Sequence, residues 1–305
     1  MRYSLLIILT IVYCSVVSAQ QTPQYTQYIY NLSTVNPAYV KDQPQVISTG
    51  LLYRKQWVSV EGSPETANAF VNFPLGEKVE LSLNYVNDQI GDAINVKNDF
   101  ANIDFAYKTQ LTSSLNLAYG LKVGLESFRI NSSGSDVAND PSFSQNESIL
   151  QLNIGAGFFL FADNFYVGLS TPNLLPNQAE IGDVGVSEDE THLFGVAGYV
   201  YDLSDAVILK PSILVKQVTG APLSFDVSMN TLLYNRFEVG ASYRYQESVS
   251  GLLGFKITPD LRIGYAYDFA VGDFSSTSSG SHEIGLLYDF DLLKTGNNYS
   301  SPRFY

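Results

Sequence analysis

The chain has 305 residues and a formal net charge of −13, which argues against a nucleic-acid partner because phosphate binding depends on Lys and Arg. Charged residues make up 15% of the chain, well below the roughly 25% of soluble domains. Tyr (21) and Phe (18) are abundant, and rings at this density are typical of a membrane–water boundary.

The first nineteen residues predict a cleaved signal peptide. The basic Arg2 precedes an apolar run over Leu5–Val12, and small residues lead up to a cleavage site after Ala19. A lipoprotein signal is the alternative, since Cys14 is present, but the bulky Tyr before it disfavours lipidation. Cleavage removes the single Cys, so the remaining chain offers no disulfide, thiolate metal site or Cys nucleophile.

The clearest structural signal is strict alternation between apolar and polar or small residues. Between Leu115 and Glu126, Leu121 and its apolar neighbours fall on one face, while Lys122 falls on the other. This length suffices for a strand to cross a bilayer, which takes about 9–11 residues. Beyond the signal peptide no apolar run is long enough for a membrane-spanning helix, so a membrane location requires a closed barrel.

The alternation predicts fourteen strands, an even number. They are expected over Gln45–Trp57, Glu65–Phe73, Val79–Val86, Val96–Lys108, Leu115–Ser127, Ile149–Phe161, Asn164–Ser170, His192–Tyr201, Ala206–Lys216, Pro222–Tyr234, Arg236–Gln246, Ser248–Ile257, Leu261–Ala270 and His282–Phe290. The predicted fold is all-β: a transmembrane antiparallel up-and-down β-barrel over residues 45–290. A periplasmic segment, residues 20–44, would precede it, and a periplasmic tail, residues 291–305, would follow.

The length of a connection depends on whether it follows an even-numbered or an odd-numbered predicted strand. Those after even-numbered strands are six residues or fewer, whereas the longest, Phe128–Ser148 and Thr171–Thr191, follow odd-numbered strands. Two connections, near Gln217–Ala221 and around Glu247, are short although they also follow odd-numbered strands. Short periplasmic turns opposite long extracellular loops are typical of outer-membrane barrels. Pro211 falls inside a predicted strand and suggests a local bulge. Mixed charges on the inward faces favour a narrow or plugged lumen over an open pore.

Four motifs carry a resemblance to a known family. They are Gln20-Gln21-Thr22-Pro23-Gln24-Tyr25-Thr26-Gln27-Tyr28, Val35-Asn36-Pro37-Ala38-Tyr39, Tyr53-Arg54-Lys55-Gln56-Trp57 and Ser281-His282-Glu283-Ile284. In this combination the chain closely resembles the PorP/SprF family of the Bacteroidetes type IX secretion and gliding machinery, from Gln20 to about Phe290. The resemblance implies an outer-membrane protein without enzymatic activity or cofactor. It also implies type IX secretion proteins or a large secreted adhesin as partners.

The motifs supply the candidate residues for partner contact. These are Tyr25, Tyr28, Asn36, Pro37, Tyr39, Arg54, Gln56, Trp57, His282 and Glu283. Two interpretations of the segment 20–44 stay open: a plug that seals the barrel, or a docking site for a periplasmic protein. Trp57 is expected to anchor at the membrane interface.

Other residues and features of the sequence bear on three further functions. Ser281, His282 and Glu283 offer the residue types of a hydrolase, but adjacent strand residues point to opposite faces, so no catalytic residue is assigned. Acidic residues gather in predicted loops, notably Asp183 and Glu188–Glu190, yet they lack calcium-site spacing and are expected to be solvated. A channel for small or hydrophobic solutes remains the alternative function.

Overall fold

The computed structural model describes residues 23–92, 94–132, 147–175, 178–181, 184–188, 191–271 and 278–292. The predicted signal peptide, the tail beyond residue 292 and the loop residues 133–146 lie outside this part of the chain. Within it, no helix has the length and apolar character needed to span a membrane.

Strands make up most of the described chain. Those of the first half are β1 (Val46–Lys55), β2 (Glu65–Pro74), β3 (Val79–Ile90), β4 (Ile94–Gln110), β5 (Asn116–Ser132), β6 (Glu147–Phe161), β7 (Phe165–Thr171), β8 (Gln178–Ile181) and β9 (Val184–Glu188). Those of the second half are β10 (His192–Tyr199), β11 (Tyr201–Ser204), β12 (Val207–Val218), β13 (Ser224–Leu233), β14 (Phe237–Arg244), β15 (Ser248–Lys256), β16 (Leu261–Ala270) and β17 (Ser281–Asp291). Two short 3-10 turns, η1 (Tyr28–Tyr30) and η2 (Leu32–Thr34), precede β1.

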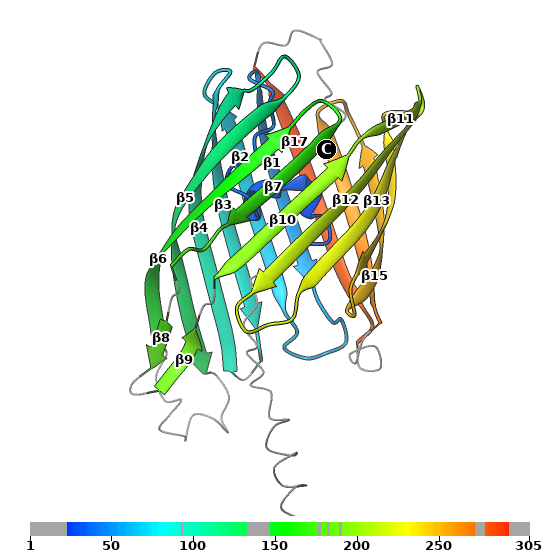
Figure 1. Ribbon diagram of the computed structural model, residues 1–305. Helices are drawn as coiled ribbons and strands as arrows, with labels where there is room; N and C mark the ends of the chain where they lie inside the picture. The colour runs from blue at the N-terminus through cyan, green and yellow to red at the C-terminus, as the bar shows by residue number, and fades with distance from the viewer. Residues whose placement is uncertain are drawn as a thin grey trace, which may run out of the picture.

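The strands close into a barrel of fourteen antiparallel strands (Figure 1). Neighbours in sequence pair along the wall, β1 pairs with β17, and β10 pairs with β12. The short β11 extends the line of β10 along β12, and β8 pairs only with β9. The predicted fold class and strand number are therefore confirmed.

The two ends of the barrel differ as the connection lengths predict. We call the end with the short connections, residues 75–78, 111–115, 162–164, 205–206, 234–236 and 257–260, the turn end, and the opposite end the loop end. The predicted strand bounds leave residues 87–95 as a connection between the third and fourth strands; this prediction is wrong, because β3 reaches Ile90 and β4 begins at Ile94. Asn87 and Asp99 are paired in this extension, where both faces carry polar residues and the alternation is absent.

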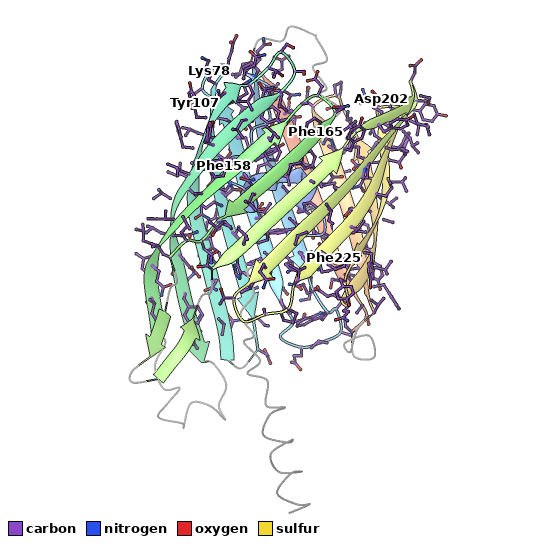
Figure 2. The ribbon with its side chains drawn as sticks, in the orientation of Figure 1. Lys78, Tyr107, Phe158, Phe165, Asp202 and Phe225 are labelled. Atoms are coloured by element: carbon purple, nitrogen blue, oxygen red, sulfur yellow. The ribbon has the colours of Figure 1, made fainter. Side chains whose placement is uncertain are left out.

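The outer wall carries an apolar band. Leu121 in β5 is 61% exposed, and its outward neighbours on the same strand are also apolar. Figure 2 shows Tyr107 and Phe158 projecting outward nearer the turn end. Exposed rings flank the band near the turn end (Tyr107, Tyr119, Tyr199, Tyr201, Tyr234, Phe237, Phe290) and near the loop end (Tyr53, Tyr85, Tyr243, Tyr245, Phe269). Two aromatic girdles around an apolar band are the signature of a transmembrane β-barrel.

The expected bulge at Pro211 is absent. The register between β12 and β13 runs without a shift from Val207 to Lys216. On the other side of β12 the ladder with β10 stops at Ser212 and resumes with β11 at Leu209. The missing N–H of Pro therefore coincides with a gap in one ladder.

Candidate functional site in the barrel lumen

The residues that precede β1 lie inside the barrel. We call Pro23–Pro44 the luminal segment; it contains η1 and η2, drawn in blue within the barrel in Figure 1. Pro23 lies beside Lys216 and Ser224, near the loop end of β12 and β13. The segment then crosses the lumen and reaches the turn end, where Leu292 N–H donates to Gln45 at 2.9 Å. Within the described chain, the first and last residues therefore lie at opposite ends of the barrel.

Near the loop end, the luminal segment is held by a buried charge cluster. Arg54 Nη1 lies 2.6 Å from Asp268 Oδ2 and 3.1 Å from Glu283 Oε2. The backbone N–H groups of Thr26 and Gln27 each donate to Glu283 at 2.8 Å. The Thr26 hydroxyl accepts from Arg54 at 2.9 Å and donates to Asp268 at 2.8 Å. Three sequence motifs and one further strand thus meet at a single point.

The composition of this cluster explains why the segment is needed there. Arg54 is 2% exposed and Glu283 is 1% exposed, so both charges are removed from water. One guanidinium faces two carboxylates, and a buried charge is costly unless it is paired and hydrogen-bonded. The N–H groups of Thr26 and Gln27 supply the donors that Glu283 lacks within the wall. The wall therefore supplies the charged groups of the cluster, and the luminal segment supplies backbone hydrogen bonds that stabilise them.

An amide network fixes the middle of the segment. Asn31 Nδ2 donates to Asn68 Oδ1 at 2.8 Å and to Asn84 Oδ1 at 2.9 Å, on β2 and β3. Asn84 in turn donates to the Ser33 hydroxyl at 3.0 Å, and Lys122 Nζ lies 3.3 Å from the Ser33 carbonyl. These buried polar groups form hydrogen bonds with one another, so burying them in the lumen leaves few of their donors and acceptors unpaired.

The Asn-Pro motif forms a turn that touches the wall. Asn36 Oδ1 accepts from Ala38 N–H at 2.9 Å, and Asn36 Nδ2 donates to Phe158 O at 3.0 Å. A Cβ on Gly120 would lie 2.2 Å from the Pro37 carbonyl carbon, and one on Gly157 would lie 2.3 Å from Asn36 Oδ1. The wall can approach the turn only because these positions are glycine.

At the turn end the segment is fixed by ionic contacts. Lys41 Nζ lies 2.5 Å from Asp289 and from the Ser48 hydroxyl, while its backbone N–H donates to Glu80 at 3.0 Å. Lys108 pairs with Asp42. Burial lowers the pKa of Lys41 from its ordinary value, and the neighbouring Asp289 opposes that shift.

Aromatic residues of the segment fill the remaining space. The Tyr28 hydroxyl lies 3.0 Å from Ser212 Oγ, and the Tyr30 hydroxyl donates to Glu238 at 3.4 Å. Tyr39 packs edge-on against Phe159, with ring centroids 5.7 Å apart. Burial raises the pKa of Tyr30 well above its ordinary value, and the nearby carboxylate of Glu238 adds to this. The packing of aromatic side chains therefore holds the luminal segment in place together with the ionic contacts.

The structure separates the predicted site residues into three groups. The buried, inward group consists of Tyr25, Tyr28, Asn36, Pro37, Tyr39, Arg54 and Glu283. Gln56 and Trp57 follow β1 in the loop-end connection and are half-buried; Trp57 N–H donates to Ser281 Oγ at 3.2 Å. His282 faces outward, where its Nδ1 lies 2.7 Å from the Tyr265 hydroxyl. Ser281 is buried and faces inward, so it and His282 lie on opposite faces, as the alternation predicts.

Sequence reasoning missed several residues that hold the segment. The alternation of β16 places Asp268 inward but does not identify it as a partner of Arg54, and neither Asn31 nor Lys41 is among the predicted contact residues. For the wall residues, the one signal in the sequence was their position on the polar, inward-facing side of each alternating strand. The acidic loop residues Asp183, Asp189 and Glu190 lie outside the described chain.

Comparisons with known proteins agree with this architecture. The model of the family described as type IX secretion system membrane protein PorP/SprF matches residues 17–288. No curated protein sequence matches the chain.

Solved structures share the fold at low sequence identity. The Ralstonia pickettii toluene transporter TbuX has a TM-score of 0.54 and 10% identity, over 85% of this chain and 92% of that chain. The CymD monoaromatic hydrocarbon channel has a TM-score of 0.54 and 12% identity, over 88% and 93%. A Pseudomonas aeruginosa FadL homologue has a TM-score of 0.51 and 10% identity, over 90% and 96%.

Proposed function

Because the chain belongs to the PorP/SprF family of type IX secretion membrane proteins, we propose that it is a non-enzymatic outer-membrane component of that machinery. In this role it supports the export or the surface anchoring of a large secreted adhesin-type protein. The short turns face the periplasm and the loop end faces the exterior, as in bacterial outer-membrane barrels. The partners are type IX secretion proteins, the secreted adhesin, or both.

The observation that supports a scaffold is the filled lumen. The luminal segment contacts wall strands on all sides: β1 and β17 through Arg54 and Glu283, β2 and β3 through Asn31, and β6 through Asn36. A transport barrel needs a path through its wall or centre, whereas a scaffold needs a stable surface. Of the two interpretations of this segment, we therefore favour the plug.

Because the short turns face the periplasm in this proposal, the loop end faces the exterior and is the surface that contacts the partner. Strands β4 and β5 have 17 residues each, well beyond the 9–11 that cross a bilayer. Their outward apolar residues lie nearer the turn end, whereas Asp99 and Arg129, which pair with each other, lie towards the loop end. The strands therefore extend past the hydrocarbon at the loop end and present a rigid platform outside it.

The test combines conductance with partner capture. Deleting Pro23–Pro44 should raise ion conductance in a planar bilayer or impair folding, while the intact protein should conduct far less than a general porin. Chemical cross-linking in the native membrane should capture type IX proteins or the adhesin with the intact chain. A sealed deletion variant that no longer captures its partner would instead identify the segment as a docking site.

A channel for small or hydrophobic solutes is the second candidate. It is favoured by two of the similar folds, which are described as a toluene transporter and a monoaromatic hydrocarbon channel. Uptake of a radiolabelled monoaromatic hydrocarbon by vesicles that contain the purified protein distinguishes the two functions. Uptake above that of empty vesicles would favour the channel.

A further inference from the structure

The basic residues on the outer face of the barrel gather in one place. On the described strands, the Lys and Arg residues that share the outward face with the apolar band are Lys55, Lys97 and Arg129. The cross-strand register connects them in a single row that runs from β1 through Glu65 and Gln89 to β4 and β5. The row lies at the loop end, although the chain as a whole carries a net charge of −13.

Two of these cations are direct neighbours in the sheet. Lys97 on β4 and Arg129 on β5 are cross-strand partners in the register of these two adjacent strands (Figure 1). Side chains at such positions have Cβ atoms about 4.5–5.5 Å apart, and like charges directly opposite each other destabilise a sheet. An anion bound between the two side chains would remove this repulsion.

The carboxylate beside this pair neutralises only one of the two cations. Asp99 accepts hydrogen bonds from the Tyr85 hydroxyl at 2.6 Å and from Asn87 Nδ2 at 2.8 Å, and it forms an ion pair with Arg129 Nη2. Lys97 forms no hydrogen bond or ion pair within the described chain. The Arg129 side chain is 44% exposed, so its other N–H groups can reach a ligand.

The pair lies at the level of the lipid headgroups. On β5, Leu125 faces outward and is 48% exposed, and Arg129 follows four residues later on the same face. Four residues extend about 13 Å along a strand, which is about 10 Å along the membrane normal at a tilt of about 40°. The polar layer on each side of the hydrocarbon is about 5–8 Å thick. The two cations therefore lie just beyond the hydrocarbon, where lipid phosphates are found.

We propose that Lys97 and Arg129 bind the phosphate group of an anionic lipid, whose acyl chains lie along the apolar band of β4 and β5. Arg binds phosphate through its planar guanidinium and Lys through its point charge. An inorganic phosphate ion would contact the cations alone, whereas a lipid also covers the apolar residues beside them. On these two strands the exposed apolar residues are Ile103, Phe105, Leu121, Val123 and Leu125.

This site goes beyond the proposed scaffold role and does not depend on it. The leaflet that supplies the lipid follows from the orientation proposed above. With the loop end at the exterior, the lipid belongs to the outer leaflet, and a phosphorylated lipid A is the matching chemical class.

The test is native mass spectrometry of the full chain in dodecyl maltoside, a detergent without phosphate. The protein is titrated with monophosphoryl lipid A and with the same lipid after removal of its phosphate. The phosphorylated lipid should bind at least about tenfold more tightly, because two cations contact its phosphate. Higher salt should reduce this preference. Inorganic phosphate at ten times the lipid concentration should not displace the lipid.

Variants connect the binding to the two cations. Lys97→Gln should weaken binding of the phosphorylated lipid about fivefold, whereas Lys97→Arg keeps the charge and should retain the preference. Two controls should change the affinity less than about twofold. Lys55→Gln removes an outward cation that is paired with Glu65, and Lys78→Gln removes an exposed cation at the turn end. Should Lys97→Gln fail to fold, Arg129→Gln tests the site in its place and should weaken binding at least as much.

Three results would overturn the proposal. Equal binding of the two lipids would show that the phosphate is not recognised. Displacement of the lipid by inorganic phosphate would assign a free-phosphate site instead. Equal weakening by Lys97→Gln and Lys55→Gln would indicate a diffuse attraction to the outer face rather than a defined site.

Discussion

Arg54 and Glu283 are 229 positions apart in the chain, yet Arg54 Nη1 lies 3.1 Å from Glu283 Oε2 inside the barrel. The two residues face each other across β1 and β17, the strands that close the cylinder, and are cross-strand partners in the register. Both also contact Thr26 of the luminal segment. Barrel closure and retention of the segment therefore depend on the same residues.

The first prediction concerns this pair. Arg54→Met should lower the free energy of unfolding by about 3–5 kcal/mol, because it leaves two buried carboxylates without their cation. The adjacent Lys55 is the matched control, since it forms a partly exposed pair with Glu65, and Lys55→Met should change the free energy of unfolding far less than Arg54→Met does. Denaturant unfolding in detergent measures both, and equal losses would contradict the assigned role of the cluster.

The second prediction concerns the contact between the wall and the Asn-Pro turn. Gly120→Val should displace the turn, because even a Cβ at this position would lie 2.2 Å from the Pro37 carbonyl carbon. Ion conductance in a planar bilayer should rise as the luminal segment loosens. Gly251→Val is the control, since a Cβ there meets nothing within 4 Å. A tightly closed Gly120→Val variant would show that the segment does not depend on this contact.

The third prediction concerns the lipid-facing band. Leu121→Arg should destabilise the folded barrel by about 2–4 kcal/mol, because Arg near the midplane must be moved into hydrocarbon. Leu111 is also exposed but lies in a connection at the turn end, so Leu111→Arg should cost only about 0–1 kcal/mol. Refolding into lipid vesicles measures the difference. Similar costs at both positions would mean that the band is not in contact with lipid.

The fourth prediction concerns the amide network. Asn31→Ala removes the donors to Asn68 and Asn84 and leaves buried acceptors unpaired, so it should cost about 1–3 kcal/mol. Asn164 also donates a side-chain hydrogen bond, to the Tyr199 hydroxyl at 3.0 Å, but on the exposed surface. Asn164→Ala should therefore change stability by no more than about 0.5 kcal/mol. Thermal unfolding in detergent compares the two variants. If Asn31→Ala leaves the stability unchanged, the amide network does not hold the luminal segment.

The wall could be predicted from sequence wherever the lipid imposes a pattern. In β5 the alternation around Leu121 and Lys122 places apolar residues outward and polar residues inward, as observed. Outside the hydrocarbon this constraint disappears, since both faces of a strand are then polar. The extension of β3 from Asn87 to Ile90 was missed for that reason and became evident only from its pairing with β4.

The candidate site was only partly accessible to sequence reasoning. The motifs singled out Arg54, Glu283 and the residues around Tyr25, but not that they touch one another or that Asp268 joins them. Nor did the alternation indicate how the segment crosses the lumen, because Pro23–Pro44 contains no strand. Its path is set by long-range hydrogen bonds to wall residues spread over much of the chain.

By itself, the sequence determined the class, the strand number and the inward or outward direction of the wall residues at the level of the hydrocarbon. It could do so because a strand in a membrane must repeat with a period of two and must end in a closed sheet. Only the tertiary structure decided what occupies the lumen, since the contacts there join residues such as Thr26 and Glu283 that no local pattern relates.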